Sequence, residues 1–214
     1  MGIEKLISGN KSFKEFEFPN FQKEMRESIK HGQKPEILFI GCSDSRVTPD
    51  LFLKTKPGDM FILRNVGNFV PMYKHDEDYH GSAAAIEYAV SVLNVKHIIV
   101  CGHSHCGACA ALYQDMPEDK ELIHIKTWLN LGKKAKEITL LDGNFKTEEE
   151  KLRETEKNSI KHQIINLLTY PAVLKRLKSG ALTIHGWHYS IEDGEISYYD
   201  ETEDKFRPLE EMIK

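Results

Sequence analysis

The segment EILFIGCSDSR, residues 36–46, places a continuous apolar run directly before a cysteine, an aspartate and an arginine. An uninterrupted apolar run of this kind is typical of a strand that is buried on both faces of a parallel sheet. Ligands of open α/β sheets bind beyond the carboxyl ends of the strands. We therefore expect Cys42, Asp44 and Arg46 to lie where a strand ends and a site begins.

A second segment, HIIVCGHSHCG at residues 97–107, repeats this arrangement. Its apolar run is followed by His103 and Cys106, which a turn into a helix would point in one direction. If the two strands are parallel neighbours, these side chains lie close to Cys42. Two thiolates and one imidazole leave one position open on a tetrahedral ion, which is the pattern of a catalytic Zn²⁺ site.

An acid and a base follow the first of these cysteines. Asp44 and Arg46 lie within four residues of Cys42, and a guanidinium can hold a carboxylate at two points. Such a pair beside an open metal position indicates metal-assisted hydration or hydrolysis rather than a structural metal clip.

Other patterns predict the remaining elements. Further strands are expected at residues 60–63, 181–185 and, after the turn Asp193-Gly194, at 195–199 as an antiparallel edge strand. Residues 114–147 are the least regular stretch. Pro19 separates two expected helices, at residues 3–16 and 19–31. A capping box at Thr147–Glu150 opens another, at 147–168. Further helices are expected at 81–93, at 105–115 and from Pro171 to before Gly180.

This alternation predicts a single α/β domain over residues 1–214, with a central, mostly parallel sheet, an antiparallel edge strand and flanking helices. Hydrophobic residues make up 40% and charged residues 29%, as in soluble globular proteins. The net charge of -4 gives no reason to expect a nucleic acid or an anionic membrane as a partner. No apolar stretch approaches the roughly 20 residues of a membrane-spanning helix.

The cysteines indicate the compartment. Three of the four lie within nine residues of one another, which favours metal-ligating thiolates in a reducing cytoplasm over a secreted disulfide framework. Residues 1–14 lack the apolar region and cleavage site of a signal peptide. We therefore expect a cytoplasmic protein.

The paired motifs C-x-D-x-R at residues 42–46 and H-x-x-C at 103–106 resemble the signature of the β-class carbonic anhydrases. Their separation matches that family, as do the stretches 64–68, 84–88 and 185–187. The resemblance is close over residues 33–110 and looser over 180–200. It implies an enzyme that interconverts CO₂ and bicarbonate with one Zn²⁺ per chain, without nucleic acid or membrane partners, as a homodimer or a tetramer.

The resemblance also implies roles for individual residues. Cys42, His103 and Cys106 would bind Zn²⁺, and Asp44 and Arg46 would form the catalytic dyad. In a closed state Asp44 would be the fourth ligand. Positions that line the substrate pocket in the plant-type branch, partly across a dimer interface, hold Gln33, Phe61, Tyr88 and Gly107.

A further site of the family bears on this chain. The other branch has an inhibitory bicarbonate site built from a Trp, an Arg and a Tyr, and the corresponding positions hold Phe39, Arg64 and Tyr189. The departure at Phe39 weakens the case for such a site. The N-terminal helices, residues 1–32, have apolar faces and are expected to wrap a partner subunit.

Several residues have plainer interpretations. His105 competes with His103 as a ligand, but the H-x-x-C spacing favours His103. Cys109 forms C-x-x-C with Cys106, which could be a redox pair, although no thioredoxin-like pattern surrounds it. Cys101 is expected in the core, and the charge run 147–157 is expected to be a solvated helix face. His75 and His80 could shuttle protons, but surface histidines are the commoner case.

Two other functions remain open from the residues alone. Hydrolysis of a CO₂ analogue such as carbon disulfide would use the same fold, with the shape of the channel deciding between them. A non-catalytic zinc module that binds a small anion or a partner is disfavoured by the presence of both Asp44 and Arg46. An assay of CO₂ hydration separates these alternatives.

The charge of the donor set predicts the pH dependence of activity. A Zn²⁺ ion held by three imidazoles lowers the pKa of its bound water to about 7. Two thiolates cancel the charge of the ion, so the water should ionise less readily and CO₂ hydration should rise toward alkaline pH. The pH profile of kcat/KM reports ionisations of the free enzyme. A flat profile over roughly pH 6–9, the range that brackets such a water, would contradict this expectation.

Overall fold

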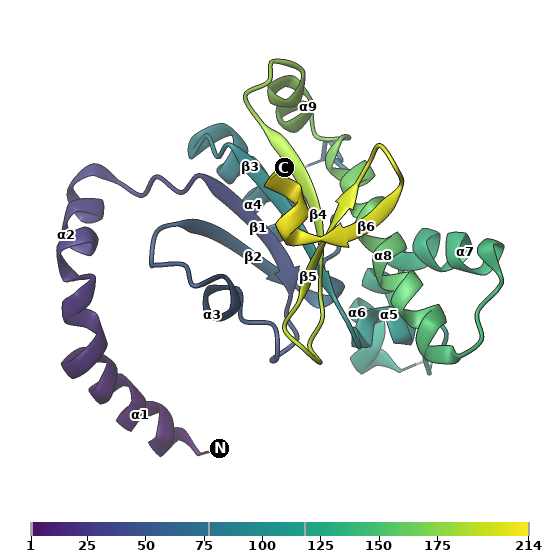
Figure 1. Ribbon diagram of the computed structural model, residues 1–214, viewed down its shortest axis with the longest axis horizontal. Helices are drawn as coiled ribbons and strands as arrows, with labels where there is room; N and C mark the ends of the chain where they lie inside the picture. The colour runs from purple at the N-terminus through teal and green to yellow at the C-terminus, as the bar shows by residue number, and fades with distance from the viewer. Residues whose placement is uncertain (1, 77, 118, 214) are drawn as a thin grey trace.

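The computed structural model describes residues 2–76, 78–117 and 119–213, and its centre is one six-stranded sheet in the order β2-β1-β3-β4-β5-β6 (Figure 1). The first four strands in this order pair in parallel, and the last two pairings are antiparallel. The strands are β1 (Ile37–Cys42), β2 (Met60–Asn65), β3 (His97–His103), β4 (Thr183–Tyr189), β5 (Ile196–Asp200) and β6 (Lys205–Pro208).

The predicted α/β architecture with an antiparallel edge is confirmed. The apolar runs at residues 36–40, 60–63 and 97–101 are the bodies of β1, β2 and β3. The strand predicted at 181–185 begins later, at Thr183, and extends to Tyr189. β6 was not predicted, because its four residues, KFRP, are largely polar and end in a proline.

Helices cover one face of the sheet closely. Leu38 and Val100 belong to a buried cluster that also contains Ile160 and Ile164 of α8 (Glu148–Leu167). A Cβ on Gly102 or on Gly186 would come within 2.8 Å of Ile160. Glycine at these two positions of β3 and β4 therefore lets α8 approach the backbone of the sheet.

The other helices surround this layer. The capping box at Thr147 is confirmed, since its side chain accepts the Glu150 N–H at 3.1 Å. The remaining helical segments are α3 (Pro49–Leu53), η3 (Val66–Asn68), α4 (Gly81–Glu87), η4 (Tyr88–Val92), α5 (Gly107–Ala111), η5 (Lys120–Leu122), α6 (Ile123–Leu129), η6 (Asn130–Gly132), α7 (Lys133–Asp142), α9 (Pro171–Lys178) and η7 (Leu209–Ile213).

The stretch 114–147 is more regular than expected, because it contains α6 and α7. These helices were not predicted, because Gly132 interrupts the helical pattern of apolar residues between them. The structure needs that glycine: a Cβ there would lie 2.8 Å from Phe69 and 3.0 Å from Leu112. α7 packs along α8 with Ala135 and Thr139 fully buried.

The N-terminal segment forms an arm that stands away from the sheet (Figure 1). It comprises α1 (Ile3–Ser12), η1 (Phe13–Glu17), η2 (Phe18–Asn20) and α2 (Gln22–His31), so the predicted break near Pro19 is confirmed. Within these elements, which the structure describes in full, no residue is buried. The apolar side chains of Ile3, Ile7 and Phe16 are about two-thirds exposed.

The opposite face of the sheet is covered less completely. Phe39, Ile99 and Cys101 are buried there beside Phe52 of α3. At the amino ends of the strands, Ile37, Met60 and Ile62 are only partly buried.

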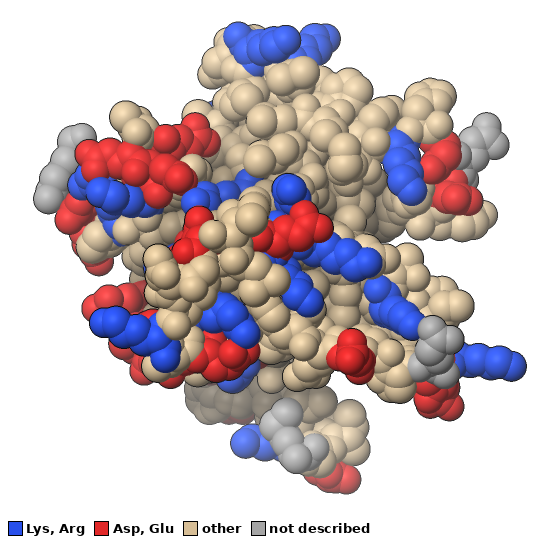
Figure 2. Space-filling model, turned by 90° about the vertical axis from the view of Figure 1, so that its right-hand side faces the viewer, with Lys and Arg blue, Asp and Glu red and all other residues tan. Residues whose placement is uncertain are grey.

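The surface carries both signs of charge. Figure 2 shows acidic and basic side chains interspersed over the face that α7 and α8 form. Among the described residues, no helix has the length and apolar character that crossing a membrane requires.

Candidate metal centre

The three side chains expected to hold a metal meet at one end of the sheet. Cys42 and His103 are the last residues of β1 and β3, and Cys106 caps the start of α5. β1 and β3 are adjacent and parallel, so their carboxyl ends coincide. The two Sγ atoms and an imidazole nitrogen all lie within 4.8 Å of one another, and all three residues are buried.

The orientation of His103 fits a metal ligand. Its Nδ1 lies 2.9 Å from the carbonyl oxygen of Ser104 and can donate to it. Its Nε2 is buried and has no hydrogen-bond partner in the described part of the chain. A ligating histidine commonly donates its other ring N–H to a carbonyl in this way. One free imidazole nitrogen facing two thiols is a donor set that fits Zn²⁺.

The two thiols hold their protons in the absence of a cation. A hydrogen bond with Cys106, reinforced by burial, raises the pKa of the Cys42 thiol to about 12. The pKa of Cys106 is raised as well, chiefly by its hydrogen bond with Cys109. Backbone N–H groups of Asp44 and Gly67 lie 3.4 Å from the Cys42 Sγ and can stabilise a thiolate there. Binding of a divalent ion would therefore release protons.

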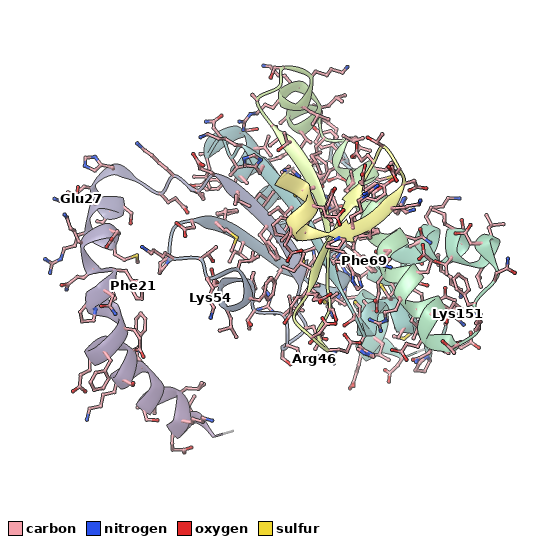
Figure 3. All side chains as sticks on the ribbon, in the orientation of Figure 1. Phe21, Glu27, Arg46, Lys54, Phe69 and Lys151 are labelled. Carbon is pink, nitrogen blue, oxygen red and sulfur yellow. The ribbon has the colours of Figure 1, made fainter. Side chains whose placement is uncertain are left out.

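Asp44 and Arg46 form the two-point ion pair that their spacing predicted. Arg46 Nε donates to Asp44 Oδ1 at 2.9 Å, and its Nη2 donates to Oδ2 at 2.7 Å. This guanidinium holds the pKa of Asp44 well below its usual range, so the carboxylate is ionised and can only accept hydrogen bonds. Arg46 Nη2 also donates to the His105 carbonyl at 3.1 Å, which ties the two ligand segments together. Figure 3 shows Arg46 below the sheet, whereas Glu27 of the arm lies at the upper left.

A second arginine restrains the backbone of the first segment. Arg64 donates to the carbonyl of Cys42 at 2.9 Å and to that of Asp44 at 2.7 Å. Phe39 and Tyr189 both lie near the ring of Phe52, which stacks on Tyr189 with centroids 4.3 Å apart. Of the three positions that correspond to the inhibitory bicarbonate site, Arg64 thus binds backbone carbonyls, and Phe39 and Tyr189 belong to an aromatic cluster.

The expected substrate-pocket residues divide into two groups. Gly107 directly follows Cys106, and a Cβ there would meet no atom within 4 Å. Phe61 and Tyr88 pack against each other with ring centroids 5.7 Å apart, but Phe61 pairs with Leu38, four residues before Cys42. Four residues along a strand span about 13 Å. Within one chain these rings are therefore remote from the thiols, and Gln33 lies exposed beyond α2.

The weaker candidates have other partners. His105 is exposed, and its imidazole contacts the carboxylate of Glu192, whose pKa is lowered to about 2, mainly by a hydrogen bond from Ser104. All four cysteines are free thiols, and Cys101 is buried in the core as expected. His80 pairs with Asp76 at 2.6 Å on the surface, and His75 is exposed.

The expectation that residues 147–157 form a solvated face is wrong for Glu156, which is 2% exposed. Its carboxylate accepts the Cys106 backbone N–H at 2.9 Å and contacts Arg153 and His188. The burial of Glu156 was not predicted because its neighbours in sequence are charged. The helical periodicity does indicate it, since Glu156 lies on the same face of the helix as Ile160, Ile164 and Leu167.

Comparison with known proteins identifies the family to which the chain is similar. The family model described as "Carbonic anhydrase" matches residues 37–196. A carbonic anhydrase of Synechocystis sp. is 39% identical over 92% of this chain and 71% of its own length, and one of Helicobacter pylori strain J99 is 37% identical over 96% and 94%. The solved β-carbonic anhydrase CcaA superposes with a TM-score of 0.88 at 38% identity, covering 96% of this chain and 91% of that one. A tetrameric β-carbonic anhydrase of Sordaria macrospora gives a TM-score of 0.79 at 30% identity, with coverage of 92% and 95%.

Replacing either thiol should abolish metal binding. Cys42→Ser and Cys106→Ser are each expected to lose stoichiometric zinc, because a hydroxyl is a poor substitute for a thiolate ligand. Metal analysis of the purified proteins measures this loss. Cys101→Ala, which removes a buried thiol outside the cluster, should retain its metal. Full zinc content in both serine variants would contradict the assignment.

Proposed function

Because the chain belongs to the β-carbonic anhydrase family, whose general reaction is CO₂ hydration, we propose that it converts CO₂ and water reversibly to bicarbonate and a proton at one Zn²⁺ ion. Cys42, His103 and Cys106 would hold the ion. The observation that carries this proposal is the buried, unpartnered Nε2 of His103, which faces two thiols beside an ionised Asp44. Bound zinc would supply a Lewis acid that makes a water molecule more acidic.

Asp44 would orient the attacking water in this reaction. Its carboxylate is ionised and therefore accepts a hydrogen bond, which directs a lone pair of the water toward CO₂. Arg46 holds both carboxylate oxygens, so Asp44 cannot swing toward the thiols and occupy the open position. Arg64 fixes the backbone on which Asp44 sits. In this proposal the two arginines keep the site open by holding one carboxylate.

Stopped-flow measurement of CO₂ hydration by the zinc-loaded protein tests the proposed activity directly. The same assay with carbon disulfide tests hydrolysis of a CO₂ analogue. A zinc-loaded protein that turns over neither compound would contradict the proposal and leave a non-catalytic zinc module as the function.

Removal of the Arg46 side chain should release Asp44. Arg46→Ala is expected to lower kcat by roughly 10- to 100-fold, because the freed carboxylate loses its orientation and competes for the open position. Zinc content, measured in parallel, should stay stoichiometric. Arg46→Lys, which keeps the charge but not the two-point contact, should fall between wild type and Arg46→Ala. Near-normal turnover in Arg46→Ala would contradict the proposed role.

We further propose that the enzyme acts as a homodimer or as an assembly of such dimers. Two observations support this. The arm exposes apolar side chains and covers no part of its own sheet (Figure 1), and one face of the sheet is incompletely covered at its amino end. A partner arm would bury both surfaces. Gln33, Phe61 and Tyr88 would then line the substrate pocket of the partner rather than their own.

Subunit complementation tests this arrangement. Tyr88→Ala and Cys42→Ser proteins should each be impaired, but a mixed dimer would contain one site with both the metal and an intact Tyr88. Coexpression in equal amounts should therefore restore about a quarter of wild-type activity, since half of the dimers are mixed and each has one complete site. Sedimentation of the wild-type chain should show a dimer or a larger assembly.

Two results would contradict this arrangement of subunits. A fully active monomer, or mixed dimers that regain no activity, would contradict a pocket that is shared between subunits.

A further inference from the structure

Glu156 is a buried carboxylate that takes no part in the reaction proposed above. Its Oε1 accepts the backbone N–H of Cys106 at 2.9 Å. Its Oε2 lies 2.9 Å from Nη1 of Arg153 and 3.1 Å from Nε2 of His188. One side chain of α8 is therefore joined both to β4, which carries His188, and to the turn that presents a metal ligand.

The bond to Cys106 satisfies a donor that the turn leaves open. Cys106 is the N-cap residue of α5, and the first N–H groups of a helix have no partner within it. In a capping box, a glutamate three residues later accepts the N-cap N–H. Here the acceptor comes from α8, fifty residues further along the chain. The hydrogen bond therefore fixes the backbone of Cys106 relative to α8, which packs against the sheet through Ile160.

The turn needs such an external restraint. His105, directly before Cys106, has a φ of 56°, a conformation that residues other than glycine adopt at a cost. Ser104 is held by its N–H bond to the Tyr189 carbonyl at 2.9 Å, and His105 by Arg46 at 3.1 Å. Glu156 holds the backbone of the ligand residue itself.

The two oxygens of Glu156 have separate tasks. A neutral amide oxygen at the same place can also accept the Cys106 N–H, more weakly than a carboxylate oxygen, so that bond depends on reach more than on charge. The charge pairs with Arg153, whose side chain is largely buried, and accepts from His188. Burial of an ion is costly unless it is paired in this way. Oε1 therefore fixes position, and Oε2 balances charge and connects α8 to β4.

We propose that Glu156 is a positioning residue for the metal centre, which holds Cys106 where a shared ion requires its thiolate. The inference rests on the proposed zinc enzyme. It predicts that zinc retention depends on the reach of residue 156, whereas thermal stability depends on its charge. Loss of a partner behind a metal ligand typically weakens metal affinity 10- to 100-fold.

Two conservative variants separate these tasks. Glu156→Asp keeps the charge but withdraws it by about 1.5 Å, the length of one carbon–carbon bond. The Cys106 backbone N–H cannot follow and falls out of hydrogen-bond range, whereas the long side chain of Arg153 can follow the carboxylate. Glu156→Gln keeps the reach and loses the charge. We expect zinc transfer from the holoenzyme to the chelator 4-(2-pyridylazo)resorcinol to be at least 10-fold faster in Glu156→Asp and within about threefold of wild type in Glu156→Gln. The melting temperature should fall more in Glu156→Gln.

Glu148→Gln, on the exposed first turn of the same helix, is the matched control and should change neither readout. Zinc release that follows the melting temperature, or that is the same in both variants, would overturn the inference in favour of a structural ion pair. If Glu156→Gln does not fold, unchanged zinc release from Glu156→Asp overturns it alone. Wild-type protein that binds no zinc would instead contradict the proposed function.

Discussion

The parallel pairing of β1 with β3 is the constraint on which the rest of the site depends. Register places Gly41 beside Cys101, so the carboxyl ends of both strands present their next side chains at one edge of the sheet. Cys42 and His103 are those last residues, and the turn after β3 adds Cys106. Because β2 and β4 flank this pair, the donor set is built on strands that are hydrogen-bonded along both edges.

Charged side chains then hold the short segments that follow the strands. Arg64 and Arg46 restrain the segment after β1, one through backbone carbonyls and the other through the Asp44 carboxylate. Glu156 restrains the segment after β3 through the Cys106 N–H. Each of these bonds joins residues from different elements or fixes the carboxylate of Asp44. The geometry of the site is therefore set by fixed ion pairs and hydrogen bonds around the donors as well as by the donors themselves.

How much of this structure the sequence predicts depends on how far apart in sequence the interacting residues lie. The apolar runs of β1 and β3 and the two motifs after them are local patterns, so the sheet and the convergence of the three donors could be predicted. α6 and α7 were missed because Gly132 breaks their pattern, although packing against Phe69 requires that glycine. Glu156 was missed because its surroundings in sequence are charged, whereas its surroundings in space are Cys106 and His188. Gln33, Phe61 and Tyr88 lie outside the site of their own chain, so only a second subunit could bring them to it.

The central claim is that two thiolates and one imidazole hold a zinc ion whose fourth ligand is not a thiolate. Zinc X-ray absorption spectroscopy of the metal-loaded, wild-type protein measures that coordination most directly. The account predicts two sulfur ligands at about 2.3 Å and two nitrogen or oxygen ligands at about 2.0–2.1 Å. A spectrum with four sulfur ligands, or with none, would contradict it.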